Sequence, residues 1–408
     1  MDEATKRTAT DDVTGEVTAE VTGAVIGQTV TGFDPLAHIR TPDGPQFDVF
    51  LQGMVFLDII FTGLPRMPRE GQEVWAEGMG SCPGGIANLA VAASRLGLRT
   101  SLGAAFGDDD YGEFCWRTLA QQEGVDLSTS RRYPDWHSPV TVSVAVEGDR
   151  NMITHGHAEP QTPTQMIGHP PRSRAVLLDL DLHEPIGQGD GWADRARADG
   201  ALIFADVGWD ATGRWDFGVL DQLEHCHAFL PNQGEAMAYT RTRTAREALY
   251  SLADRVPLAV VTQGPDGAIA YDSSTGEESV VPALWVDAID PTGAGDVFAA
   301  SLTLGTLAGW PLDDRLAFAS LCSSLAVQQV GGSLAAPAGA TSQTGGTARC
   351  AAPTPAPTTG RCGSGTPSST TSCRRCRSAP FAAPAPRSRG SPTLEPWARA
   401  HRPPGPWA

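Results

Sequence analysis

Lysine is almost absent from this sequence, because Lys6 is the single lysine among 408 residues. A Walker-A loop needs a lysine after its glycines, a protein kinase needs a lysine on a strand, and Schiff-base chemistry needs a lysine amine. Lys6 lies in a stretch without a sustained hydrophobic period, so it suits none of these roles. The scarcity of lysine therefore excludes P-loop nucleotide hydrolases, protein kinases and pyridoxal enzymes.

Long apolar runs and compact cysteine clusters are missing as well. No run is long enough to cross a bilayer, and the N-terminus lacks the basic-then-apolar layout of a signal peptide, so we expect a cytoplasmic protein without a membrane partner. Four of the eight cysteines lie beyond residue 336, and they include one CxxC pair, Cys373 and Cys376. A zinc ribbon needs a second such pair, so we expect neither a structural zinc nor a disulfide framework.

Positive charge is scarce in most of the chain. Residues 337–408 hold nine arginines and one glutamate, a net charge of +8. The remaining 21 basic and 46 acidic residues give residues 1–336 a net charge of −25. Nucleic-acid binding needs clustered Lys and Arg, so this acidic body argues against a nucleic-acid partner and favours a small-molecule substrate.

Composition divides the chain into three parts. Residues 1–46 are rich in Thr, Val, Gly and acids without a period, which predicts a mobile extension. Residues 47–336 carry the hydrophobic patterns of a folded domain. Residues 337–408 are rich in Ala, Pro, Gly, Ser, Thr and Arg, which predicts a disordered tail, and their Lys-free composition suggests a frameshifted reading of GC-rich coding sequence. An α/β-like continuation in another reading frame of the gene would support the frameshift.

Short apolar segments alternate with helical ones between residues 47 and 336, which predicts βαβ units on a mainly parallel sheet with helices on both faces. We expect strands at 47–61, 100–107, 175–182, 201–208, 227–232, 257–264 and 268–272, and helices at 84–98, 113–124 and 245–254. Residues 138–156 instead alternate with period two around a turn at 147–150, which predicts a β-hairpin that serves as a lid.

The stretch DPTGAGD, Asp290 to Asp296, precedes an apolar segment that suits a helix. Glycines at 293 and 295 allow a tight turn and close approach to a ligand, and the N-terminus of the helix favours an anion. A substrate hydroxyl between Asp296 and a phosphate would explain the carboxylate there, with Asp296 as general base. The alternative, an aspartate that caps the helix, is the better explanation of this stretch taken alone.

The same stretch resembles the C-terminal signature of the ribokinase-like (PfkB) family of carbohydrate kinases. Matching residues are Asp290, Thr292, Gly293, Ala294, Gly295 and Asp296, with Pro291 in place of a threonine. The resemblance runs from about residue 49 to 336 and implies a three-layer α/β/α fold with a small β lid. It also implies that Asp296 is the catalytic base and that the amides of Gly293, Ala294 and Gly295 form an anion hole.

The family's N-terminal signature has a looser match in CPGGIANLAVAASRLGL. Gly84, Gly85 and Asn88 are retained, and Asp58 matches an aspartate on the first strand of the family. The resemblance implies that these four residues bind the hydroxyls of the sugar. Asn88 could alternatively cap a helix or lie within one, but the order of the motifs favours the functional interpretation.

Two further motifs follow in the family's order. Asn232 and Glu235 match an Asn-x-x-Glu motif that acts on the metal and phosphates largely through water, and hard oxygen ligands suit Mg²⁺. Thr262, Gly264 and Gly267 match a Thr-x-Gly-x-x-Gly stretch beside the nucleotide. Each motif is weak evidence for the family by itself, whereas four motifs in the expected order are strong evidence.

Together these residues imply transfer of the γ-phosphate of ATP to a hydroxyl of a sugar or sugar-like molecule, with Mg²⁺. The resemblance also implies a monovalent cation, K⁺ in many relatives, at Asp290 and Thr292, and a homodimer formed through the lid. Two alternatives stay open. The chain could be a nucleoside kinase of the same fold, or a homologue that has lost catalysis because of its aberrant C-terminus.

Overall fold

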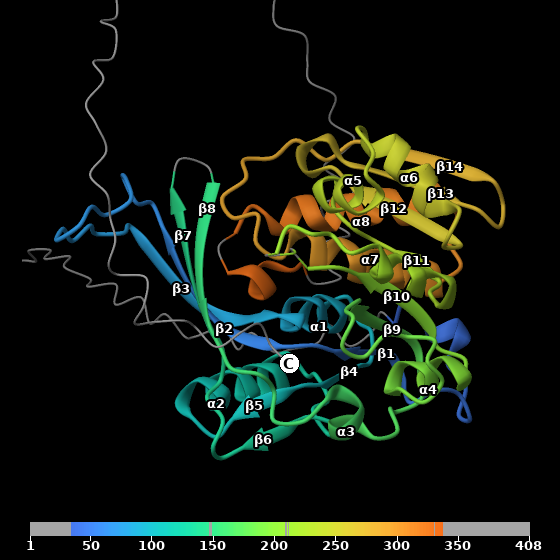
Figure 1. Cartoon of the computed structure of the whole chain (residues 1–408), viewed down its shortest axis with the longest axis horizontal. Coiled ribbons are helices and arrows are strands. Elements are labelled where there is room, and N and C mark those ends of the chain that lie inside the picture. The colour runs from blue at the N-terminus through green and yellow to red at the C-terminus, as the bar shows by residue number, and fades with distance from the viewer. Residues whose placement is uncertain (1–33, 147–148, 209, 211, 330, 338–408) are drawn as a thin grey trace, which may run out of the picture. The chain divides into compact units, whose positions relative to one another are not determined.

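The computed structural model describes residues 34–337 except 147–148, 209, 211 and 330 (Figure 1). The predicted extension up to residue 33 and the predicted tail from residue 338 lie outside the described residues. The boundary at residue 46 is wrong, because residues 34–46 already pack against the domain. Leu36 is fully buried in the hydrophobic core, and Arg40 forms an ion pair with the buried Asp48.

Eight strands form the central sheet, in the order β14-β13-β12-β11-β10-β9-β1-β4. Their bounds are β1 Phe47–Gln52, β4 Thr100–Gly103, β9 Ser173–Asp179, β10 Leu202–Asp206, β11 Ala228–Phe229, β12 Leu258–Thr262, β13 Ala268–Asp272 and β14 Glu277–Val281. All neighbours from β4 to β12 are parallel, and β13 and β14 add an antiparallel edge. The predicted mainly parallel sheet is confirmed.

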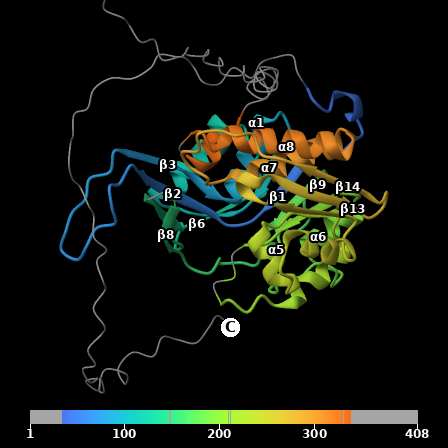
Figure 2. The same ribbon diagram turned by 90° about the horizontal axis from the view of Figure 1, so that it is seen from above.

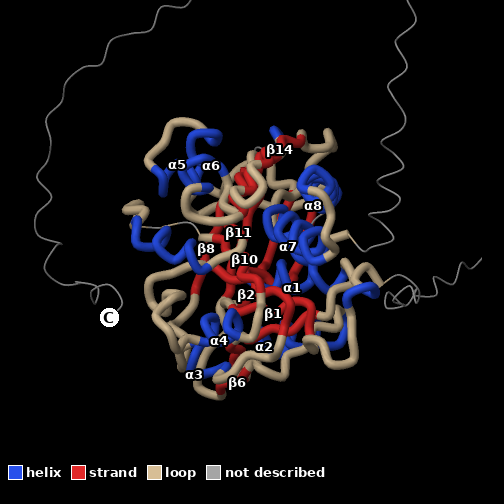
Figure 3. The backbone as a smooth tube through the Cα atoms, turned by 90° about the vertical axis from the view of Figure 1, so that its right-hand side faces the viewer, coloured by secondary structure: helices blue, strands red, loops and turns tan. Residues whose placement is uncertain are grey.

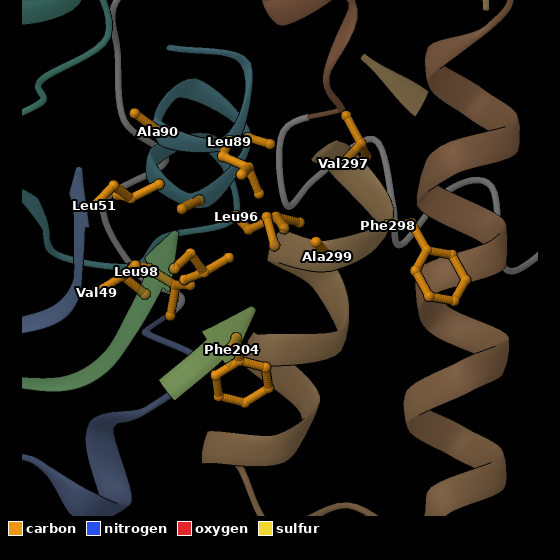
Figure 4. Packing of buried hydrophobic residues seen from close by; sticks show 14 of the residues in the cluster. Val49, Leu51, Leu89, Ala90, Leu96, Leu98, Phe204, Val297, Phe298 and Ala299 are labelled. Atoms are coloured by element: carbon orange, nitrogen blue, oxygen red, sulfur yellow. The ribbon is translucent and has the colours of Figure 1, made fainter. Parts of the chain in front are cut away.

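Helices cover both faces of this sheet, as Figures 2 and 3 show. One face carries α1 Ile86–Arg95, α7 Ala294–Leu307 and α8 Leu312–Ala326, and the other carries α4 Trp192–Ala198, α5 Gln233–Thr240 and α6 Ala245–Ala253. Each face has its own hydrophobic cluster. Figure 4 shows part of the first cluster, to which Leu89 of α1, Val297 and Ala299 of α7 and strand residues such as Val49 contribute. Apolar burial on both faces explains the near-continuous hydrophobic strands and confirms the predicted α/β/α layers.

A second sheet has the order β3-β2-β7-β8 and is called here the lid sheet. It consists of β2 Val55–Thr62, β3 Gly78–Gly85, β7 Val140–Val146 and β8 Asp149–His155. The predicted hairpin is confirmed by the antiparallel pairing of β7 with β8, although part of its turn, 147–148, lies outside the described residues. Whether this sheet closes as a lid stays a prediction.

Several predicted elements are divided differently in the structure. The single strand predicted at 47–61 is two strands in different sheets, with a break at Gly53 and Met54. A Cβ on Gly53 would lie 2.8 Å from the Cβ of Ile86, so the chain can pass α1 this closely only with glycine. The helix predicted from residue 84 begins at Ile86, because Gly84 and Gly85 pair with β2 as the end of β3.

The remaining elements complete the domain around the two sheets. They are β5 Ala105–Gly107 paired with β6 Arg131–Tyr133, the helices α2 Asp110–Arg117 and α3 Pro163–Ile167, a π-helical turn at Thr118–Gln122, and 3-10 helices at Ala37–Ile39, Phe217–His225, Gly264–Asp266 and Gly332–Ala335. Among the helices of the described residues, none combines the length and hydrophobicity that a bilayer crossing requires.

Candidate active site

Polar side chains gather where four neighbouring parallel strands end. Asp179 is the last residue of β9, Asp206 the last of β10, Asn232 follows β11, and Thr262 ends β12. A β-bridge joins Asn232 to Thr262 directly, so two of the sequence motifs are neighbours in space. The carboxyl ends of parallel strands are where open α/β sheets bind ligands, so this edge is the candidate site.

The N-terminus of α7 lies at the same site. Its N-cap is Gly293, whose φ of 75° and ψ of 3° are left-handed and favour glycine. Asp290 is 6% exposed, and its two carboxylate oxygens accept hydrogen bonds from the amides of Thr292 (2.9 Å) and Gly331 (3.3 Å). The Ala294 amide donates to the Pro291 carbonyl at 3.2 Å within the turn.

Gly295 leaves open space beside the first turn of α7. A Cβ built on Gly295 would meet no atom within 4 Å, and the backbone there is not left-handed, so neither packing nor strain calls for glycine. The first turn of a helix has amides without intrahelical acceptors. An unobstructed helix N-terminus of this kind can receive an anionic group.

Asp296 is the third residue of α7 and is half-buried. The interpretation of Asp296 as the helix cap is therefore wrong, because the helix starts at Ala294 and Gly293 occupies the cap position. The negative charge of Asp296 contributes to raising the pKa of Asp206 at the end of β10. Asp296 is thus close enough to Asp206 for the charges of the two carboxylates to interact.

The lid sheet supplies Asp58, which is 9% exposed and lies opposite Cys82 on β3. Its carboxylate occupies the space above Gly84, where a Cβ would come within 1.9 Å of Oδ2. Gly85 has a φ of 63°, and a Cβ there would lie 2.4 Å from the Met54 carbonyl oxygen. Gly84 thus makes room for Asp58, and Gly85 allows β3 to turn directly into α1.

Asn88 lies inside α1 and brings the two halves of the site together. Its Cγ is 3.5 Å from where a Cβ of Gly293 would be, and its Oδ1 is 3.1 Å from the corresponding position at Gly332. The side chain is 5% exposed, and Oδ1 accepts no hydrogen bond from any part of the chain that the structure describes. The N-cap of α1 is Gly85, so Asn88 does not cap the helix. A buried carbonyl oxygen without a donor is costly, which points to a donor from a ligand.

Asn232 and Glu235 form a capping box at the start of α5. Asn232 Oδ1 accepts from the Glu235 amide, and Glu235 Oε2 accepts from the Asn232 amide, both at 3.0 Å. This reciprocal capping explains the Asn-x-x-Glu spacing without a metal. Burial raises the pKa of Glu235, with a further contribution from Asp179, although its hydrogen bonds to Asn232 act in the opposite direction.

The glycines after β12 differ in their surroundings. Gly267 has a φ of 97°, and a Cβ there would lie 2.0 Å from the Val281 carbonyl oxygen, so the backbone requires glycine. Gly264 has a φ of 57° and open space around its Cα. Thr262 lies beside Asn232, and its amide donates a hydrogen bond to the Pro231 carbonyl at 3.2 Å.

Two acids at this edge were not among the predicted site residues. Burial raises the pKa of Asp206 well above its usual value, with further contributions from Asp179 and Glu235. Burial also raises the pKa of Asp179, followed by the charge of Asp181. Asp179 is itself exposed and lines a pocket together with Gln52 and Glu184, so protein atoms surround it without covering it. Each is an acid that directly ends an apolar strand, and that position is the sequence signal that could have identified them.

These raised pKa values describe carboxylates whose negative charges act on one another at the strand ends. Among the described residues, no three His, Cys, Asp or Glu side chains surround a common metal position. A cation held by one or two carboxylates and completed by water and phosphate oxygens fits the arrangement, and this is how Mg²⁺ is usually bound.

Comparison with known proteins identifies the family. A profile of the pfkB family carbohydrate kinases matches residues 68–339. A nucleoside kinase of Methanothermobacter thermautotrophicus is 29% identical over 300 residues, which cover 70% of this chain and 90% of that protein. A ribokinase of Bacillus subtilis is 27% identical over 284 residues, which cover 68% of this chain and 92% of that protein.

Solved structures show the same fold. The Arabidopsis thaliana ribokinase complexed with ribose and ATP has a TM-score of 0.59 at 20% identity, covering 74% of this chain and 98% of that chain. The Salmonella enterica aminoimidazole riboside kinase, complexed with aminoimidazole riboside and an ATP analogue, has a TM-score of 0.58 at 25% identity and covers 73% of this chain and 99% of that chain.

Proposed function

The chain belongs to the pfkB family of carbohydrate kinases, as its motifs predicted, and from this premise we propose that it transfers the γ-phosphate of ATP to a hydroxyl of a sugar or riboside. The observation that carries the proposal is the orphaned Oδ1 of Asn88 beside the open N-terminus of α7. A hydroxyl donor and a phosphate would meet at that point. Ribose and aminoimidazole riboside in the similar structures support an acceptor of this size and polarity.

The acceptor is bound between the lid sheet and α1. Asp58 and Asn88 present buried oxygens that accept hydrogen bonds from sugar hydroxyls. The Asn88 oxygen has no donor among the described residues, and a site that leaves such a group unpaired without its ligand discriminates strongly for that ligand. Gly84 and Gly85 allow Asp58 and the start of α1 to approach each other. Their role in this proposal is to shape the site rather than to contact the sugar through side chains.

The transferred phosphoryl group lies at the N-terminus of α7. Positioned amides and the helix dipole stabilise the charge that spreads over its oxygens in the transition state. Gly293 and Gly295 keep the backbone accessible, and the Ala294 amide helps to hold the turn through Pro291. Asp296, two residues inside the helix, accepts the proton of the acceptor hydroxyl as general base.

The acids at the strand ends fit a divalent cation that accompanies ATP. The charges of Asp179 and Glu235 contribute to raising the pKa of Asp206, and the charge of Asp179 contributes to raising the pKa of Glu235, so a cation there would stabilise the charged forms of these acids. Mg²⁺, when bound, neutralises phosphate charge. Asn232 orients Glu235 through the capping box, while Thr262, Gly264 and Gly267 shape the adjoining backbone for the nucleotide.

A monovalent cation such as K⁺ is also proposed at Asp290 and Thr292. Asp290 is buried, and each of its oxygens accepts one amide hydrogen bond, which leaves acceptor capacity on the carboxylate. Turnover in K⁺ buffer should exceed turnover in a buffer with only a bulky organic cation. Equal rates in both would remove the monovalent cation from the proposal.

A homodimer through the lid sheet is supported by an apolar face on that sheet. Cross-strand pairing aligns Phe61 with Met79 and Val144, and Ile59 with Val142, which itself faces Ile153. Met79 and Ile153 are 65% and 73% exposed. Sedimentation of the protein should show a dimer that Ile153→Arg dissociates; a monomeric wild type would contradict this part of the proposal.

The reaction is tested by incubating the protein with ATP, Mg²⁺ and separate pentoses, hexoses and nucleosides. Phosphorylated product from a sugar is the expected result. Product from nucleosides alone would favour the nucleoside kinase alternative, and ATP binding without any product would favour a homologue that has lost catalysis.

A further inference from the structure

Arg95, the last residue of α1, makes an unusual number of directed contacts. Its Nη1 donates to the carbonyls of Leu334 at 2.8 Å and Ala336 at 3.0 Å. Its Nε and Nη2 donate to the two carboxylate oxygens of Glu123, both at 2.7 Å. One guanidinium therefore ties α1, the segment after α2 and the last described turn of the chain together.

The turn that Arg95 holds is called here the 331–336 segment, and its opposite end belongs to the active site. The Gly331 amide donates to Asp290 Oδ2, while Asp290 Oδ1 accepts from Thr292, which precedes the N-cap of α7. Gly332 lies against Asn88 and Thr292, since a Cβ there would be 3.1 Å from Asn88 Oδ1 and 3.3 Å from Thr292 Cγ2.

The two glycines of this segment cannot hold their positions by themselves. Gly331 has a φ of 123° and Gly332 a φ of 48°, conformations that glycine adopts easily but also leaves easily. Fixed hydrogen bonds at the other end of the segment restrict this freedom. Arg95 supplies two of them, and Glu123 fixes the orientation of its guanidinium through a bidentate pair.

We propose that Arg95 is a positioning residue for phosphoryl transfer, which rests on the function proposed above. It holds the 331–336 segment so that Gly331 and Asp290 keep the Thr292–Gly293 turn in the geometry that aims the first amides of α7. Arg95 touches neither the acceptor nor the nucleotide in this proposal. It acts by binding the carbonyls of Leu334 and Ala336, and the effect reaches the turn through the Gly331 amide and the Asp290 carboxylate.

The proposal requires the planar fork of arginine and not only its charge. A lysine has one ammonium group and does not reproduce two parallel bonds to Glu123 together with two bonds to carbonyls. Arg95→Lys should therefore lower kcat at least fivefold, while the KM for ATP should change less than about twofold. The reason is that the orientation of the first amides of α7 matters most in the transition state. The pH profile should keep its shape, since the general base is unchanged.

Arg40 provides a matched control. It also pairs with a buried acid, Asp48, and donates to a carbonyl just beyond α1, that of Gly97 at 3.2 Å, but its contacts lie at the start of β1. Arg40→Lys should lower Tm without changing kcat per folded molecule. If Arg95→Lys behaves in the same way, Arg95 is only structural and the proposal is overturned.

Amide hydrogen exchange separates this proposal from the proposed function. In Arg95→Lys, peptides covering 292–297 and 331–336 should exchange at least fivefold faster than in wild type, whereas Arg40→Lys should leave them unchanged. This measurement needs no substrate, so it is decisive even if the wild type phosphorylates no acceptor. Unchanged exchange at 292–297 would disprove the connection from Arg95 to the anion-binding turn.

Discussion

At the scale of single residues, Asp296 is the group on which the proposed chemistry depends most. Asp296→Asn should lower kcat by at least about a hundredfold, because general-base catalysis contributes about 10²–10⁴ and asparagine accepts no proton. The KM for ATP should hold or fall, since one negative charge near the phosphates is removed. Steady-state kinetics with a confirmed acceptor measure both constants.

The matched control for Asp296 is Asp110→Asn, which removes an acid from the first turn of α2. A favourable charge at a helix N-terminus contributes about 0.3–1 kcal/mol, so either variant would lose a little stability if only the helix dipole were involved. Wild-type turnover in Asp296→Asn would show that Asp296 supports the helix and does not take part in proton transfer.

Gly84 gives a second prediction at this scale. The methyl group of Gly84→Ala would lie 1.9 Å from Asp58 Oδ2, so the carboxylate must move away. The acceptor KM should rise more than tenfold with little change in the KM for ATP, and overpacking should cost about 1–3 kcal/mol of stability. Gly191→Ala is the control, because its added Cβ meets nothing closer than 3.8 Å. Similar acceptor KM values in both variants would contradict a role for Asp58 in acceptor binding.

At the scale of elements, the carboxyl ends of β9 and β10 predict a pH dependence. Asp206 and Asp179 have raised pKa values in the folded chain. The folded state therefore retains protons that the unfolded state has released, so these acids lower stability as pH rises from about 4 through their raised pKa values. Mg²⁺ should offset this loss, and its effect on Tm should grow with pH.

The comparison that isolates this effect is Asp206→Asn against wild type. Without divalent cations its Tm should exceed that of wild type by a margin that grows between about pH 5 and pH 8, since one pKa unit corresponds to about 1.4 kcal/mol, or about 2–4 °C for a domain of this size. Asp221→Asn, which removes an exposed acid, serves as control. A Tm difference between Asp206→Asn and wild type that does not change with pH would contradict a raised pKa of Asp206.

Elements also show what the sequence could and could not specify. The parallel strands and the hairpin were predictable because apolar runs and period-two alternation are local signals. The break at Gly53 was not, since Phe47–Gln52 and Val55–Thr62 are both apolar and only their pairing partners distinguish them. Strand β3, with the sequence GMGSCPGG, has low intrinsic strand propensity and exists because it pairs with β2.

The site was predictable to the extent that its motifs are contiguous. Asp290 to Asp296 form one turn, and that turn lies at the start of a helix as predicted. Asp206 and Arg95 were missed because their partners are distant in sequence, so no local spacing reveals them. Asn232 and Glu235 show the opposite difficulty, since the same spacing serves a capping box and a metal motif.

At the scale of the whole molecule, the two ends of the 331–336 segment allow the expected end of the folded domain to be tested by truncation. Truncation after Pro337 should leave Tm and turnover unchanged, because residues 338–408 carry no hydrophobic pattern with which to pack. Truncation after Gly331 should lower Tm and abolish turnover, because it removes the buried Ala335 and Ala336 and the carbonyls that Arg95 binds. Thermal melts and kinase assays of the two proteins check this. Loss of stability in the longer protein would show that the tail packs.

The direct passage from β3 into α1 has a mechanical consequence. Gly85 ends β3 and Ile86 begins α1, so no linker residue separates the lid sheet from the helix that carries Asn88. On the other side, two residues, Gly53 and Met54, separate β1 from β2. A sheet attached by such short links can pivot but cannot slide, and each pivot applies torque to the first turn of α1. If the lid sheet closes as predicted, its movement is transmitted directly to α1, so closure and the orientation of Asn88 are coupled.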